Sequence, residues 1–432
     1  MKLLLFATNN TPRLSYISHF IFNELMGVDC IITQSPEVFQ NYEGHKINYS
    51  HQIFSGLQFT ISPVPLLFET TINNQKINCF KFNNYTAFFK LNNGDFSFDI
   101  FAGTFYLLSR YEEYLPHKKD MYGRFAHENS LAFTEGFLQL PLINIWIKDF
   151  KQTLKNKFPA LQIIVPVFTF LPTYDIDMAF SYKHKGLVRN LGGFLKHPSL
   201  QRLKVLCRIN KDPFDVYDQL DNLHKKYHLK PIYFFLIAAK NSVYDKNISP
   251  HNRTMAKLII RHAKNYTVAI HPSWQSGDNI SLLKKEINNL EQITGKPIKI
   301  SRQHYIRFNL PEGYNRLLEN NITDDYSMGY GSINGFRASV ASSFFWYDLL
   351  AEQQTALRLH PFCYMEANSF YEQRLTPAEA FNELMEYYTI CKDVNGTLIT
   401  IWHNHLLGTD KLYTGWAKMY EKILEVIGDE HH

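Results

Sequence analysis

The chain has 432 residues, of which 45% are hydrophobic, so it is long enough to bury a sizeable core and to form two or three globular domains. Its 45 Lys and Arg residues exceed its 40 Asp and Glu residues by only five, and a net charge of +5 is too small to indicate nucleic-acid binding by itself. The five cysteines are widely spaced and form no C-x-x-C pair, which argues against a disulfide framework and against a cysteine zinc site.

The N-terminal residues and the lengths of the apolar runs predict where the protein is located. The apolar run before Asn9 is short and lacks the small-residue cleavage site of a signal peptide, and no run approaches the roughly 20 residues that span a bilayer. We therefore expect a cytoplasmic protein in a reducing compartment. The terminal His431 and His432 resemble the remnant of an affinity tag, and no chemistry is assigned to them.

Residues 1–165 are predicted to form a smaller N-terminal domain of α/β or α+β class. After a first strand, Thr11 as cap, Pro12 at the first helical position and Gly27 at the far end predict a helix. Strand-like alternation follows between Cys30 and Ile100, and helices are predicted over 101–114 and 141–157. No catalytic motif occurs in this part, so its role stays unassigned.

Residues 166–432 alternate apolar strands with amphipathic helices. Strands are predicted over 167–176, 231–238, 266–271, 298–302, 323–328, 355–360 and 397–403. One helix begins with a capping box, Thr376 to Glu379, and another shows an apolar stripe of Leu283, Ile287, Leu290 and Ile293. Seven such units predict a parallel sheet closed into a β/α barrel, in which chemistry gathers at the carboxyl ends of the strands.

Polar side chains do follow several of these strands. Asp175 and Asp177 are two residues apart, so on an extended strand both carboxylates project to one side, where one divalent cation can bind them. Such a cation could hold one carboxylate as a ligand and leave the other as a general base. His271 could add a ring nitrogen as a further ligand. Arg302, His304 and His403 are other polar residues at the ends of predicted strands.

Four segments together resemble the successive motifs of the polysaccharide deacetylase (NodB-homology) superfamily. They are Asp175-x-Asp177, His271-Pro272-Ser273, Arg302-Gln303-His304-Tyr305 and Trp402-His403. The resemblance covers roughly residues 167–428. It implies a distorted (β/α)7 barrel that holds a divalent metal, commonly zinc, and removes N- or O-acetyl groups from sugars. It also points to a bacterial sub-group with an extra N-terminal domain of unknown function.

Carried over by position, the resemblance makes Asp175 the catalytic base, Asp177 and His271 metal ligands, Arg302 the residue that orients the base, and His403 the general acid. The third metal ligand is open, because the residue four after His271, where the family has a second histidine, is Gln275. His304 could supply the missing nitrogen, with Ser276 or water as weaker substitutes. The spacing of the two aspartates by Ile176 is a second departure from the commonest motif.

Four residues are candidates for substrate contact. Tyr305 and Trp402 belong to the matching motifs, and Asp325 lies in a stretch that resembles the substrate groove of the family. Arg337 could bind an anionic group or pair with the acidic residues of that stretch, and a surface salt bridge is the alternative for it.

Residues 182–211 contain eight Lys and Arg residues, no acidic residue, and interleaved leucines. Such a segment could lie on an anionic membrane surface or meet a phosphate-bearing sugar carrier; a solvated flap is the alternative. For the whole chain we expect a metal-dependent carbohydrate deacetylase acting on an acetylated carbohydrate. A sugar-binding relative without the metal and a metal-dependent amidase or esterase are the alternatives, and the oligomeric state stays open.

Overall fold

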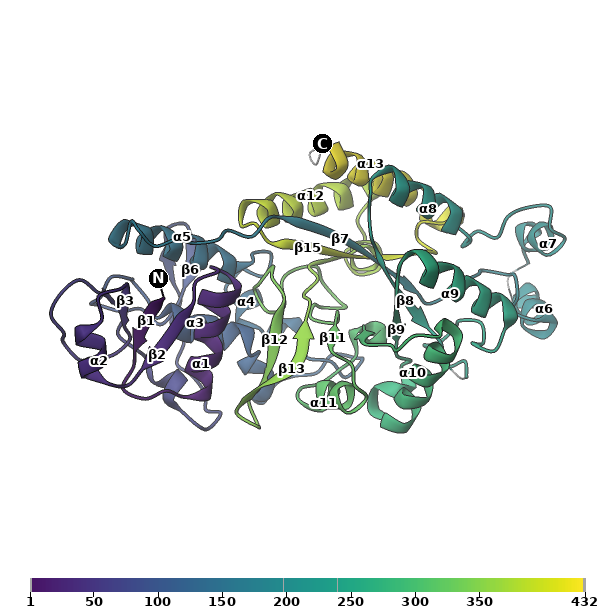
Figure 1. The fold of residues 1–432 in the computed structure, drawn as a ribbon. Coiled ribbons are helices and arrows are strands. Elements are labelled where there is room, and N and C mark those ends of the chain that lie inside the picture. The colour runs from purple at the N-terminus through teal and green to yellow at the C-terminus, as the bar shows by residue number, and fades with distance from the viewer. Residues whose placement is uncertain (1, 197, 239, 430–432) are drawn as a thin grey trace. The chain divides into compact units, whose positions relative to one another are not determined.

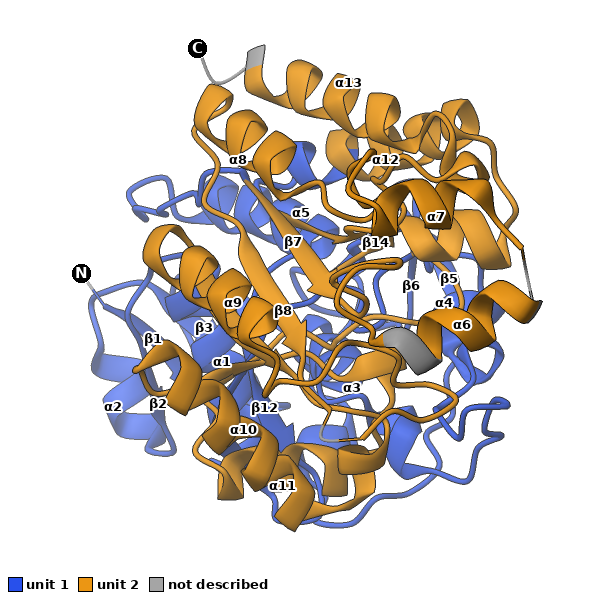
Figure 2. Ribbon diagram, turned by 90° about the vertical axis from the view of Figure 1, so that its right-hand side faces the viewer, with its two compact units in different colours: residues 1–169, 335–361, 390–397 blue, residues 170–334, 362–389, 398–432 orange. Residues whose placement is uncertain are grey.

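The computed structural model describes residues 2–196, 198–238 and 240–429, which form two compact units (Figures 1 and 2). Unit 1 comprises residues 1–169, 335–361 and 390–397, and unit 2 comprises residues 170–334, 362–389 and 398–432. Two segments that the sequence analysis placed in the second domain therefore belong to unit 1. The suspected tag residues His431 and His432 lie outside the described residues.

Unit 1 contains a parallel four-stranded sheet in the order β2-β1-β3-β4. Its first helix, α1 (Pro12–Ser18), starts as predicted, because the Thr11 side chain accepts a hydrogen bond from the Leu14 N–H. The helix continues as a π-helical segment over His19–Glu24, and Gly27 follows with φ +61°. The strands are β1 (Leu3–Phe6), β2 (Cys30–Thr33), β3 (Lys46–Asn48) and β4 (Phe59–Thr60).

The other helices of unit 1 are α2 (Pro36–Asn41), α3 (Ile100–Leu108), α4 (Leu131–Thr134) and α5 (Leu142–Lys157). Helix α3 ends before the predicted residue 114 because Arg110 adopts φ +55°, a left-handed conformation that a helix cannot continue. Two antiparallel hairpins complete the unit: β5 (Phe80–Phe82) with β6 (Tyr85–Ala87), and β12 (Phe344–Asp348) with β13 (Gln353–Leu359).

The β12-β13 hairpin corrects the prediction for residues 355–360, which were expected to form a parallel strand after a helix. Asp348 bends the chain, since its carboxylate accepts hydrogen bonds from the N–H groups of Leu350 and Ala351. Glu352 then takes φ +50°, and the chain returns antiparallel to β12. This tight turn carries no glycine or proline, so the sequence gives little sign of it.

Unit 2 confirms the predicted α/β class with a parallel sheet. Its strands follow the order β11-β10-β9-β8-β7-β15-β14, and the pairs for which register is defined are all parallel. These strands are β7 (Thr169–Ile176), β8 (Ile232–Leu236), β9 (Thr267–His271), β10 (Ile300–Ser301), β11 (Asp324–Asp325), β14 (Tyr364–Met365) and β15 (Thr397–His403).

Helices separate most of these strands along the chain (Figure 2). They are α6 (Leu187–Lys196), α7 (Leu200–Leu206), α8 (Tyr217–Lys226), α9 (Arg253–Asn265), α10 (Ile280–Thr294), α11 (Glu312–Glu319), α12 (Pro377–Asp393) and α13 (Trp416–Asp429). The capping box of α12 is confirmed, because Thr376 and Glu379 exchange hydrogen bonds between side chain and backbone. Within the described ranges, no helix is both long and apolar enough to cross a bilayer.

Candidate metal centre

The pairing register of the sheet places the polar residues that follow its strands at the same height along the strand direction. Ile176, Phe235, Ile270 and Ser301 are paired in one row across β7, β8, β9 and β10. The residues one step further along the chain, Asp177, His271 and Arg302, therefore leave the sheet at the same edge. Because side chains alternate between the faces of a strand, these residues project to the same side, and Asp175 shares that side with Asp177.

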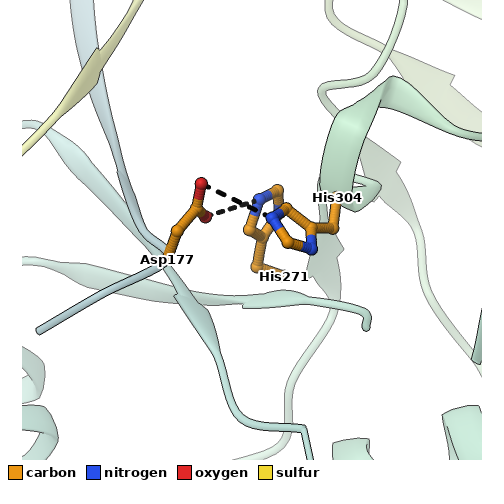
Figure 3. Close-up of side chains that lie close together, drawn as sticks. All are labelled: Asp177, His271 and His304. Carbon is orange, nitrogen blue, oxygen red and sulfur yellow. Dashed lines mark ion pairs between the residues drawn. The ribbon is translucent and has the colours of Figure 1, made fainter. Parts of the chain in front are cut away.

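Asp177, His271 and His304 form a cluster of potential metal ligands (Figure 3). One ligand atom from each residue can be chosen so that all lie within 4.8 Å of one another. The Nε2 atom of His271 is 3.2 Å from Oδ1 of Asp177, and the Nε2 atom of His304 is 3.5 Å from Oδ2 of the same carboxylate. Asp177 is the most accessible of the three, with 19% of its side chain exposed, so the cluster can be reached from outside.

In His271 and His304, the ring nitrogen that does not face Asp177 already has a hydrogen-bond partner. Nδ1 of His271 lies 2.5 Å from the backbone oxygen of Arg302, and Nδ1 of His304 lies 3.0 Å from Oδ1 of Asp245. A carbonyl oxygen only accepts hydrogen bonds, so Nδ1 of His271 carries a proton and its Nε2 is left as the electron-pair donor in the neutral ring. This pattern, in which an outer partner fixes the tautomer, is usual for metal-binding histidines.

Asp245 is a part of the site that sequence reasoning missed. It lies in the irregular segment after β8, is fully buried, and also accepts a hydrogen bond of 2.9 Å from the Trp274 N–H. Its second oxygen accepts from Ser242 at 2.9 Å and lies 3.4 Å from the Gln275 amide. Gln275 is thus directed toward Asp245, and the nitrogen beside Asp177 comes from His304. A single aspartate in a loop gives no local sequence signal of this role.

Asp175 is paired with Arg302. Nη1 of Arg302 donates to Oδ1 of Asp175 at 2.8 Å, while Nε donates to the backbone oxygen of Tyr326 at 3.0 Å. The guanidinium lies over the ring of Phe234, 4.1 Å from its centroid, which fixes its plane. The second oxygen of Asp175 is 3.7 Å from Nε2 of His271. One carboxylate oxygen is therefore held by the arginine and the other faces the cluster.

His403, at the end of β15, approaches the cluster from another strand. Its Nε2 is 3.5 Å from Oδ2 of Asp177, and its Nδ1 is 3.0 Å from Oε1 of Glu366. Glu366 is fully buried and also accepts a hydrogen bond from the His403 backbone N–H. It follows β14, a strand of two residues that the sequence analysis did not predict, so this partner was missed as well.

The electrostatics of the cluster are dominated by buried opposite charges. Burial alone would raise the pKa of Asp177, but the neighbouring histidines, His304 first among them, outweigh it and hold that pKa well below its usual range. Burial alone would lower the pKa of both His304 and His403, but the neighbouring carboxylates raise these values to about 9 and about 10. Protons on His304 and His403 thus balance the neighbouring carboxylates.

The residues present fit a divalent metal. Oδ1 of Asp177 is buried and has no hydrogen-bond donor with suitable geometry within the described residues. One carboxylate and two imidazoles are a common donor set for a catalytic zinc site, which keeps a further position open. A dication bound at Nε2 of His304 would replace a proton there, so its binding would be coupled to proton release.

The remaining candidates are placed differently. Tyr305 is half-buried and packs against His304, with 4.6 Å between ring centroids. Asp325 is fully buried and accepts hydrogen bonds from the hydroxyl groups of Ser301 and Ser327, and Trp402 is fully buried with its indole N–H donating to Thr400. The side chains of Asp325 and Trp402 therefore make their hydrogen bonds within the protein core.

Arg337 belongs to unit 1 and is 1% exposed. Its guanidinium makes a two-pronged ion pair with Glu113, at 2.8 and 2.6 Å, and Glu113 also accepts from Arg110. Burial raises and the two arginines lower the pKa of Glu113, leaving it at about 2. Arg337 is therefore a buried structural residue, which corrects both the expectation of a substrate contact and the alternative of a surface salt bridge.

Comparisons with known proteins find one family model and several solved structures. A family model described as a family of unknown function (DUF7033) matches residues 3–159, and no curated protein matches. A putative polysaccharide deacetylase from Mycobacterium smegmatis is 12% identical over 61% of this chain and 84% of that one, with a TM-score of 0.40. A probable polysaccharide deacetylase from Pseudomonas aeruginosa is 11% identical over 60% and 84%, with a TM-score of 0.39. A polysaccharide deacetylase from Bacillus cereus is 13% identical over 61% and 89%, with a TM-score of 0.30.

Proposed function

We propose that the protein is a metal-dependent hydrolase that removes acetyl groups from an N- or O-acetylated carbohydrate. The observation that carries the proposal is the joint arrangement around Asp177: two histidine Nε2 atoms beside its carboxylate, with the Asp175–Arg302 pair on one side and the His403–Glu366 pair on another. All of these residues except Glu366 lie in the segments that carry the sequence resemblance to the polysaccharide deacetylase superfamily, whose distorted (β/α)7 barrel is the proposed fold of the C-terminal domain, residues 166–432.

Asp177, His271 and His304 would hold the metal, and zinc suits this donor set best. When bound, the metal supplies Lewis-acid chemistry, which polarises an acetyl carbonyl and lowers the pKa of a water molecule. Asp175 would accept a proton from the attacking water at Oδ2, because Arg302 already occupies Oδ1. The Arg302 contact holds this carboxylate so that Oδ2 faces the cluster.

His403 would protonate the leaving amine or alcohol from Nε2. Its Nδ1 is bound to Glu366, so the proton at Nε2 is the one that faces the cluster. Burial lowers the pKa of His403 and the carboxylates of Glu366, Asp177 and Asp175 raise it, to about 10, which favours the protonated ring at neutral pH. Placing a base and an acid on opposite sides of a polarised carbonyl supports hydrolysis of an amide or an ester.

The test combines metal content with acetate release. Wild-type protein, stripped and reloaded with zinc, should bind about one metal per chain and release acetate from acetylated sugars. His304→Ala should lose the metal, while Gln275→Ala, which alters an exposed side chain beside Asp245, should retain it. Absence of metal from reloaded wild type would contradict the proposal and favour a sugar-binding relative. Turnover of simple amides or esters in preference to acetylated sugars would instead favour the amidase or esterase alternative.

A further inference from the structure

Within unit 2, the segment between β7 and α8, here called the insertion, begins just after Asp177. Helices α6 and α7 lie at the outer margin of unit 2, apart from its sheet (Figure 1). The two ends of the insertion are tied together at the buried Asp212, whose carboxylate accepts backbone hydrogen bonds of 2.7 to 2.9 Å from Ser181, Tyr182 and Lys183. The insertion is therefore a hairpin of two helices on a fixed base.

The hairpin exposes large apolar side chains to an unusual degree. Leu195 is 74% exposed, Leu200 76% and Ile209 72%, and Leu191, Leu203 and Leu206 are also exposed. Leu191 and Leu195 are one turn apart on α6, so they lie on one face of that helix. Single exposed leucines are normal on protein surfaces, but six exposed large aliphatic residues within 19 positions make an apolar surface that calls for an explanation.

Basic residues dominate the charges of this segment, although Lys211 at its end pairs with Asp215 and Asp218, at 3.8 and 3.3 Å. None of the eight basic residues of segment 182–211 has an acidic neighbour within the segment. Arg189 and Arg202 donate to backbone oxygens and so help to shape the hairpin. Lys204 and Arg208 are exposed and, among the described residues, take part in no ion pair. These two cations are available to an external anionic surface.

We propose that the α6-α7 hairpin docks the protein onto an anionic lipid bilayer, with the leucines in the headgroup region and the cations among lipid phosphates. An apolar face bordered by cations is the pattern of helices that lie in a membrane interface. A second copy of the same hairpin would bring like charges together without acidic groups to offset them. Helices of ten and seven residues are too short to span a bilayer, so the docking is peripheral.

The experiment is cosedimentation with vesicles of phosphatidylcholine alone and of equal parts phosphatidylcholine and phosphatidylglycerol. Wild-type protein should bind the anionic vesicles and be released as the salt concentration rises. Lys204→Glu with Arg208→Glu should lower the partition coefficient at least about 20-fold, since each basic residue contributes about five-fold. Leu191→Ser with Leu195→Ser should lower it about ten-fold or more, because the leucines lose favourable burial.

The control is Leu412→Ser, which removes an equally exposed leucine elsewhere on unit 2 and should leave binding unchanged. All variants alter exposed side chains, and circular dichroism together with unchanged zinc content checks their fold. No binding of wild type to anionic vesicles, or equal binding by both double variants, would overturn the proposal. Leucine-dependent dimerisation without lipid would overturn it too. Vesicle binding does not depend on catalysis, so failure here and failure of the deacetylase proposal are distinguishable.

Discussion

Asp175 and Asp177 lie on the same strand and face the same cluster, yet their partners differ. Asp175 is paired with Arg302, whereas Asp177 faces three histidine nitrogens. We expect Asp175→Asn to bind metal as the wild type does and to lose turnover by about 100-fold or more, the contribution of a positioned general base. Asp177→Asn should lose both metal and turnover. Elemental analysis and acetate release measure the two effects separately, and full activity of Asp175→Asn would refute its assignment as the base.

Asp245 acts through His304 and is a positioning residue. Asp245→Asn should weaken zinc binding by about 10- to 100-fold, the usual effect of removing the outer partner of a metal-binding histidine. Zinc affinity measured by competition with a chelator gives the result directly. Ser242→Ala removes a hydrogen bond to the other oxygen of Asp245 and is the matched control, for which a smaller effect is expected. Equal affinities for Asp245→Asn and wild type would mean that His304 needs no such support.

At the scale of the elements, helix α9 packs on the sheet through a buried histidine. His262 is 1% exposed and contacts the ring of Tyr233, with 4.3 Å between centroids, while its Nδ1 bonds to the Leu258 carbonyl. Burial lowers the pKa of His262 from 6.5 to about 4. Between these two pH values the unfolded chain takes up a proton that the folded protein does not, so the folded state loses stability as the pH falls.

The free energy of unfolding should therefore fall by roughly 1 kcal/mol per pH unit between pH 6.5 and about 4 on account of His262 alone. Urea unfolding of His262→Phe over this range should show a shallower dependence on pH, because phenylalanine does not titrate. His251→Phe, at an exposed position, should keep the wild-type slope. Identical slopes for wild type and His262→Phe would show that the histidine is not buried in its neutral form.

At the scale of the whole molecule, metal binding and folding should be linked. The proposed ligands come from three separate segments, which are brought together only in the folded chain. Zinc at 100 times its dissociation constant should then raise the free energy of unfolding by about 2.7 kcal/mol and shift the melting temperature upward. Calorimetry with and without a chelator measures this shift. Asp177→Asn should show no shift, and a chelator-sensitive melting temperature in that variant would place the stabilising metal elsewhere.

Features that depend on near neighbours along the chain could be predicted from the sequence. The cap at Thr11, the capping box at Thr376, the parallel strands of unit 2 and the polar groups at their ends all follow from periodicity and from contacts within a few residues. The sequence also marked Asp175, Asp177 and His271, because strand ends of one parallel sheet lie at one edge. It did not predict the β12-β13 hairpin, whose turn uses Asp348 and Glu352 in place of the usual turn residues.

Which side chains support the cluster depends on how distant segments pack in the folded chain. Asp245 holds His304 from 59 residues away and Glu366 holds His403 from 37, while Arg337 pairs with Glu113 across 224 residues. No local pattern encodes such pairs, because the partner of a buried charge is set by how distant segments pack, and any acidic residue of suitable reach could serve. For the same reason the sequence left the third metal ligand open. The fold places His304 beside Asp177 and turns Gln275 toward Asp245.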